Sequence, residues 1–205
     1  MGLFPFYLGR SEEGLDNIEQ ALKVHPDNLT SLWMQSIMLV DVGRLDDAAQ
    51  VLKRLQASRL ENDLLLMTRH ALALEAHDAQ SATEALSGLQ AFVKDPGNSH
   101  QHDLTWVTLV TVPFLARHHQ VDAALPLLRQ LEDRISAPYD WLRENRDLES
   151  LRGEPLFQGI LSRARTRFQD QVSVLRSAQA VGELPEFLVK PLDDLVARLG
   201  ISSSK

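Results

Sequence analysis

The sequence predicts an all-α protein, and three observations point to that class. Apolar residues recur every three or four positions through most of the chain, which is the period of an amphipathic helix. The helix breakers, 10 Gly and 9 Pro among 205 residues, fall largely between these periodic stretches. Alternating apolar and polar runs bounded by hairpin dipeptides are missing, so a β-sheet has no support in the sequence. We therefore expect helices throughout, packed against one another.

The first two predicted units share a pattern that begins at a glycine. Residues 7–28 combine a turn at Gly9, an amphipathic helix and a stop at Pro26. Residues 29–62 form a fuller unit, with an apolar helix, a turn at Gly43 and a second amphipathic helix. The two glycines are about 34 residues apart, and each is followed by an arginine and an acidic helix start. This spacing indicates a repeated helix–turn–helix unit, of which the first copy is truncated at its start.

The residues at these positions resemble the tetratricopeptide repeat (TPR) family, whose unit is a helix–turn–helix of about 34 residues. Gly43 matches the family's turn between helices, and Ala48 and Leu52 match the small and large packing positions of the second helix. In the first unit Pro26 matches the terminating position, whereas Gly14 replaces the usual alanine. A small residue is favoured there because it lets two helices approach closely. The resemblance implies a right-handed α-solenoid with a concave surface.

Two further units match the pattern less well. The third, from about Asp63 to Asn98, has no glycine at its turn, and residues 76–82 look too long for that turn. The fourth, from about Asp103 to Ser136, contains Pro113 and Pro126 within its helices. Each proline removes a backbone hydrogen bond, so we expect it to bend or shorten its helix.

The chain is expected to divide into TPR-like repeats over residues 1–138, capping helices over residues 139–200 and a frayed tail over residues 201–205. Leu148, Leu151 and Phe157 belong to a stretch that resembles the closing segment of bacterial TPR arrays. Such a segment would cover the apolar face that the last repeat exposes.

Two C-terminal helices are predicted, from about Pro155 to Ala180 and from Pro185 to Leu199, with Gly200 as the stop. The second helix carries an apolar stripe that could mediate self-association. The stripe consists of Leu188, Leu192, Leu195 and Leu199.

The sequence carries no recognisable catalytic or metal-binding motif. The absence of cysteine excludes disulfides, thiolate catalysis and cysteine-ligated zinc. The pairs His100/His102 and His118/His119 lack the i, i+4 spacing that places two imidazoles on one helix face, and we expect them in solvated loops. No strained serine turn or glycine-rich phosphate loop is found. We therefore expect a protein that is not an enzyme and uses no metal or cofactor.

The charge and hydropathy of the chain exclude two classes of partner. The net charge of −7, from 21 basic and 28 acidic residues, argues against nucleic acid. No apolar run reaches the roughly 18–20 residues that span a membrane, and the first residues do not read as a secretory signal, so a cytoplasmic location is expected. The basic cluster Arg163, Arg165 and Arg167 could receive an acidic partner or a second copy, although a solvated helix face is the alternative.

The family resemblance implies that the first helix of each unit lines the concave groove. Carrying that register over predicts a groove made of Trp33, Ile37, Asp41, Met67, Glu75, Trp106, Leu109 and Arg117. Aromatic and methionine side chains suit an adaptable peptide-binding surface, and the three charged residues would orient the ligand. The alternative is that Trp33 and Trp106 pack between repeats.

The function expected from the resemblance is a non-enzymatic scaffold that binds a partner protein or peptide in this groove. The first alternative is a C-terminal sensor or docking arm of a larger signalling protein or enzyme, such as a kinase, cyclase or transcription regulator. A helical enzyme with a site on the concave face is a further alternative. The sequence does not identify the partner.

Overall fold

The computed structural model describes residues 6–7, 10–57, 63–94 and 101–200, and every regular element in this part of the chain is a helix. The predicted all-α class is confirmed for these residues. The expected turn at Gly9, the histidine His100 and the tail 201–205 lie outside the described residues.

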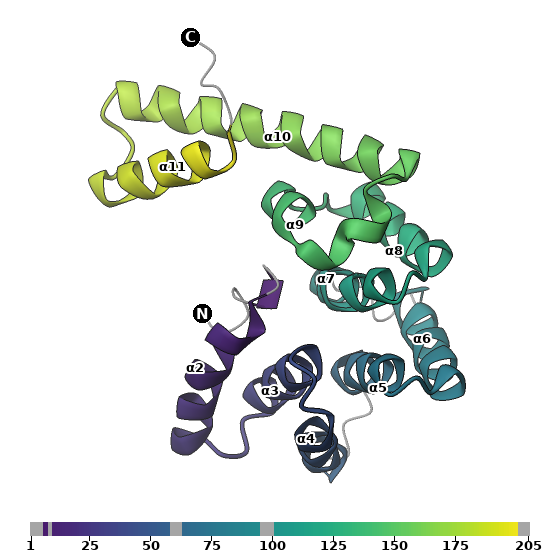
Figure 1. The fold of residues 1–205 in the computed structure, drawn as a ribbon. Coiled ribbons are helices and arrows are strands. Elements are labelled where there is room, and N and C mark those ends of the chain that lie inside the picture. The colour runs from purple at the N-terminus through teal and green to yellow at the C-terminus, as the bar shows by residue number, and fades with distance from the viewer. Residues whose placement is uncertain (1–5, 8–9, 58–62, 95–100, 201–205) are drawn as a thin grey trace.

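The helices pack in neighbouring pairs that form two rows (Figure 1). The inner row consists of α3 (Leu29–Asp41), α5 (Asp63–Glu75) and α7 (Gln101–Arg117). The outer row consists of α4 (Leu45–Ala57), α6 (Ala79–Lys94) and α8 (Val121–Arg134). Helix α2 (Ser11–Val24) packs against α3 at the N-terminal end. Because each inner helix contacts its outer partner and the next inner helix, the apolar core runs continuously along the array.

The two helices of each pair are joined by turns of the same form. Gly43, His77 and His119 hold the left-handed conformation, with φ of 77°, 57° and 55°. At each turn the next backbone N–H reaches back to a carbonyl in the last helical turn, with N–O distances of 2.8, 2.9 and 2.8 Å. The prediction of a longer turn in residues 76–82 is wrong, because α6 already begins at Ala79. Histidine is among the residues that tolerate this conformation, so the turn forms without glycine.

Neither interior proline shortens its helix, so of the two expected effects, bending or shortening, the second does not occur. Helix α7 continues through Pro113 to Arg117, and α8 continues through Pro126 to Arg134. Helix α7 is buried on nearly every side from Val107 onwards. This packing compensates for the hydrogen bond that Pro113 removes, whereas helix propensity alone would favour a break.

The C-terminal part covers the end of the two rows. A short helix α9 (Tyr139–Glu144) and a 3₁₀ helix η2 (Arg146–Leu151) lead into α10 (Pro155–Ala180), the long helix that crosses the top of Figure 1. Helix η2 packs against α7 and α8, and buries Leu148 and Leu151 completely. The predicted bounds of α10 are confirmed.

Helix α10 is fastened to α8 by a nearly buried carboxylate. Glu132 accepts hydrogen bonds from Arg163 at 3.0 Å and from Arg167 at 2.8 Å. Burial raises the pKa of Glu132, but the hydrogen bonds from these two guanidinium groups outweigh burial and lower the pKa overall. Two residues of the predicted basic cluster therefore bind an acidic residue of their own chain, and the third, Arg165, is exposed.

Helix α11 (Glu186–Arg198) folds back on α10, and most of the predicted self-association stripe faces inward. Leu192 and Leu199 are buried, Leu195 is half-buried, and Leu188 is exposed. Ion pairs from Arg176 to Asp193 and from Arg198 to Glu144 add to this packing. Self-association through the stripe stays a prediction.

Candidate functional site

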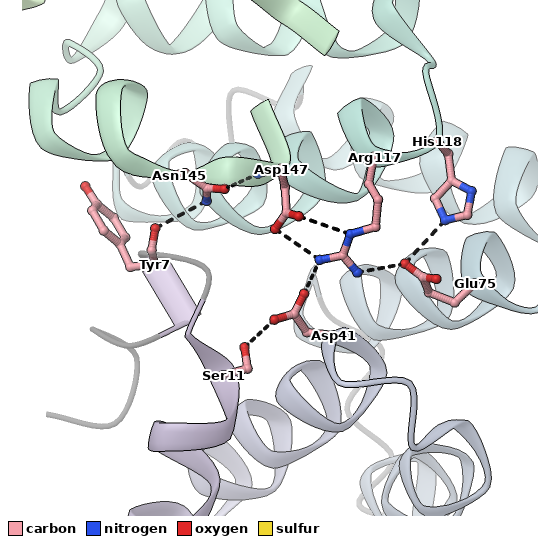
Figure 2. Close-up of polar contacts among 8 residues, drawn as sticks. All are labelled: Tyr7, Ser11, Asp41, Glu75, Arg117, His118, Asn145 and Asp147. Carbon is pink, nitrogen blue, oxygen red and sulfur yellow. Dashed lines mark hydrogen bonds and ion pairs between the residues drawn. The ribbon is translucent and has the colours of Figure 1, made fainter. Parts of the chain in front are cut away.

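The candidate site lies where the three inner helices end. Asp41, Glu75 and Arg117 are the last residues of α3, α5 and α7, and each stands two positions before the left-handed residue of its turn. Because the turns have the same form and the helices lie side by side, the three side chains converge (Figure 2). Three charged residues of the predicted groove are therefore brought into direct contact.

Arg117 is the centre of this convergence. Its Nη1 donates to Glu75 Oε1 at 2.9 Å, its Nε donates to Asp147 Oδ1 at 3.2 Å, and its Nη2 lies 3.0 Å from Asp147 Oδ2. The same Nη2 also donates to Asp41. We call these four residues the Arg117 cluster. Asp147 belongs to η2, so the cluster ties the C-terminal part of the chain to all three inner helices.

The Arg117 cluster has more negative than positive charge. Three carboxylates surround one guanidinium; the acidic side chains are 9–22% exposed, and that of Arg117 is 29% exposed. Burial lowers the pKa of Arg117, but the hydrogen bonds and charges of Asp147 and Asp41 outweigh burial and raise it, so the guanidinium stays charged. Ser11 Oγ donates to the second oxygen of Asp41 at 2.5 Å, and His118 Nε2 lies 3.3 Å from Glu75 Oε1. The cluster is a partly exposed group of connected side chains with more acidic than basic members.

Residues near the N-terminus lie against the same face. The ring of Phe6 stacks on that of Phe114 at 6.4 Å, and the Arg117 guanidinium lies 5.2 Å from the centroid of the Phe114 ring. The ring of Tyr7 lies 6.3 Å from that of Trp141 in α9. Asn145 Nδ2 donates to the Tyr7 carbonyl at 3.3 Å (Figure 2).

The apolar residues of the predicted groove are placed differently from the charged ones. Trp33, Ile37, Met67 and Leu109 are at most 4% exposed, so in this conformation they belong to the core between helices. Trp106 is half-buried and meets Trp33 edge to face at 6.4 Å. The two tryptophans thus pack against each other, which agrees with the alternative interpretation of packing between repeats.

Sequence reasoning missed several residues of this face: Phe6, Tyr7, Ser11, Asn145 and Asp147. Asp147 directly precedes Leu148 of the predicted closing segment, and its partner Arg117 is 30 residues away. Asn145 and Tyr7 are 138 residues apart. No local spacing in the sequence predicts contacts of this range.

The histidines at the turns form a small recess rather than a recognisable metal site. His118 lies edge to face with His77 at 5.9 Å, next to a depression of about 200 Å³ that both residues line. His119 is exposed, as expected for a turn residue, whereas His118 is half-buried. Within the described residues, no three His, Cys, Asp or Glu side chains are grouped so that they could hold a metal ion. None of the described helices combines the length and the apolar character that a bilayer crossing requires.

Comparison with known proteins yields no match to a family model, a curated protein or a solved structure. The resemblance to the TPR family therefore still depends on the residues and spacings described above.

Proposed function

We propose that this chain is a non-enzymatic scaffold of TPR-like helix pairs that binds a partner protein or peptide beside the Arg117 cluster. The observation that carries the proposal is the convergence of Asp41, Glu75 and Arg117 at the ends of three successive helices, with Asp147 closing the group. One carboxylate neutralises the charge of one guanidinium, whereas here three carboxylates contact the same one. The surplus favours a partner that brings positive charge.

The residues around the Arg117 cluster favour binding because they restrict the motion of its charged side chains. The side chains stand at the ends of packed helices, and the apolar residues below them are buried, so the charged groups are held in fixed positions. A lysine or arginine of the partner would meet acceptors that are already oriented, which lowers the entropy lost on binding. We propose that this electrostatic complementarity sets the orientation of the partner.

The test uses affinity capture from native lysate, quantified by mass spectrometry. Glu75→Gln removes one negative charge of the cluster with little change in shape, and Glu12→Gln removes the same charge from an exposed position on α2. A partner recovered by the wild type and by Glu12→Gln should fall at least fivefold with Glu75→Gln, and its capture should weaken with added salt. Circular dichroism and urea unfolding of each variant show whether the fold is kept. Equal recovery by both variants would count against the proposal.

A further inference from the structure

A recess of about 200 Å³ lies between the turn after α5 and the turn after α7, next to the Arg117 cluster. Its floor and walls include Ala73, Leu74 and Ala82, which are buried, and the rings of His77 and His118. We name it the histidine recess and propose that it receives one aromatic side chain of the partner, from a segment that also carries a basic residue. This inference rests on the proposed function, because it names the chemistry of the segment that the scaffold binds.

The size and lining of the histidine recess suit a single six-membered ring. A cavity of about 150 Å³ in a protein core holds one benzene molecule, so a recess of about 200 Å³ has space for one ring and little more. The floor is apolar and at most 6% exposed at each of Ala73, Leu74 and Ala82. The imidazoles of His77 and His118 lie edge to face at 5.9 Å, and contacts between aromatic rings add to the gain from burying apolar surface. An aromatic side chain therefore gains more here than an aliphatic one.

Hydrogen bonds and turn geometry hold the backbone around the recess. His77 has the left-handed conformation of its turn, with φ of 57°. The neutral ring of His70, which is buried, donates from Nδ1 to the Ala82 carbonyl at 3.0 Å. Asp78 accepts from the Ser81 N–H at 3.1 Å and so caps the start of α6. Because this backbone is in place before a ligand enters, less entropy is lost on binding.

His118 links the histidine recess to the Arg117 cluster. Its Nε2 lies 3.3 Å from Glu75 Oε1, the same oxygen that accepts from Arg117 Nη1 at 2.9 Å (Figure 2). A ring that contacts His118 is therefore close to the carboxylates of the cluster, whose surplus favours a cation. In an extended peptide, side chains two positions apart point to the same side. An arginine two residues before a phenylalanine can thus serve both sites.

The experiment titrates the tripeptide acetyl-Arg-Gly-Phe-amide into the full chain, labelled with ¹⁵N and followed by NMR. Ala79 lines the recess at the exposed first position of α6, so Ala79→Leu places a larger side chain there. Ala91→Leu makes the same change at an exposed position of the same helix, outside the recess. We expect the tripeptide to bind Ala79→Leu at least fivefold more weakly than the wild type or Ala91→Leu.

A second pair of variants removes a wall of the recess instead of filling it. Asparagine tolerates the left-handed conformation, so His77→Asn keeps the turn and removes the ring. His119→Asn makes the same change at the matching position of the turn after α7, where the side chain does not line the recess. We expect binding to weaken about threefold or more with His77→Asn and to stay unchanged with His119→Asn. Circular dichroism checks that each variant is folded.

Two further peptides test the ring of the ligand on the wild type alone, so they remain decisive even if a variant does not fold. Alanine in place of phenylalanine should weaken binding at least fivefold, and leucine should bind more weakly than phenylalanine. Equal affinity for the phenylalanine and leucine peptides would overturn the inference. So would equal affinity of the wild type, Ala79→Leu and His77→Asn for the phenylalanine peptide, or no saturable binding up to about 10 mM.

The outcome also separates this inference from the proposed function. Tripeptide binding that weakens with Ala79→Leu, but is unchanged when alanine replaces the arginine of the peptide, would support the recess and count against the role of the Arg117 cluster. Partner capture that falls with Glu75→Gln, together with tripeptide binding that ignores Ala79→Leu and His77→Asn, would leave the scaffold role intact and refute the recess.

Discussion

At the residue scale, Arg117 joins carboxylates from α3, α5 and η2 that would otherwise face one another. Replacing it by methionine keeps much of the side-chain volume and leaves three like charges close together. Breaking a buried ion pair costs about 3–5 kcal/mol. The Arg117 side chain is partly exposed, so we expect Arg117→Met to lower the free energy of unfolding by a smaller amount, about 2–4 kcal/mol.

The matched control is Arg44→Met, which removes an exposed pair with Asp47. Exposed pairs contribute about 0–1 kcal/mol, so this variant should unfold almost like the wild type in urea. Similar losses from both substitutions would mean that the Arg117 cluster does not stabilise the fold beyond an ordinary surface contact.

His70 adds a pH dependence at the same scale. It is buried in α5, and its Nδ1 lies 3.0 Å from the Ala82 carbonyl, so the neutral ring donates there. Burial lowers the pKa of His70 below its ordinary value of 6.5, and the nearby His118 acts in the same direction, against the hydrogen bond to Ala82. The unfolded chain thus takes up a proton near pH 6.5, whereas the folded chain does so only at lower pH.

Stability from the neutral His70 is therefore complete above pH 6.5 and decreases as the pH falls toward the lowered folded value. We expect His70→Gln to flatten the fall in unfolding free energy between pH 7.5 and 5.5, as measured by urea titrations at several pH values. His25→Gln, at an exposed position after α2, serves as the control. Parallel pH profiles for the wild type and His70→Gln would contradict this account.

At the element scale, the turns after α3 and α7 offer a matched pair of substitutions. Gly43 and His119 share the left-handed conformation, and a Cβ at Gly43 would meet no atom within 4 Å. Any destabilisation by Gly43→Ala therefore comes from the backbone conformation, and we expect the free energy of unfolding to fall by about 1–2 kcal/mol. His119→Gly should instead raise the free energy of unfolding by about 0.5–1 kcal/mol, because part of the relief is offset by the entropy of glycine. Thermal and urea unfolding measure the stability of both variants. A lower free energy of unfolding for His119→Gly would show that the His119 ring makes a stabilising contact.

The elements themselves were predictable because their signals are local. Apolar periodicity and flanking breakers predicted the bounds of α10, and the glycine spacing predicted the turn at Gly43. The turn at His77 was misjudged because the prediction required glycine where histidine also fits. Helix α7 continues through Pro113 because burial, which no local pattern encodes, outweighs the effect of proline.

The candidate site was predictable only in the part that follows the register predicted from the sequence. Asp41, Glu75 and Arg117 occupy the same position of successive units, so the register that selected them also brings them together. Asp147 and Tyr7 reach the same face through contacts across 30 to 138 residues. Such contacts depend on how the C-terminal part and the residues near the N-terminus pack against the array, and a single sequence does not encode them in any visible spacing.

At the scale of the whole molecule, burial is distributed unevenly along the chain. Helix α7 lies in the middle of the core and contacts α5, α8 and η2. Helix α11 and the second half of α10 form an outlying hairpin in Figure 1, where Leu192 and Val196 are the buried residues of α11. Large apolar side chains at its tip, including Phe187 and Val181, are mostly exposed. The hairpin therefore has few apolar contacts to hold it in place.

This difference predicts the order of local opening. Backbone amides exchange with solvent through local unfolding, whose free energy follows the buried contacts of each element. We expect hydrogen exchange followed by mass spectrometry to be slowest in α7 and fastest, among the helices named, in α11. Leu192→Asp should speed exchange in α11 and the second half of α10 at least tenfold while leaving α7 unchanged, because it places a charge in the hairpin contact. Phe187→Asp, on the exposed surface of the same helix, should change neither region. If Leu192→Asp instead speeds exchange in α7 to the same extent, the hairpin and the array unfold as one cooperative unit.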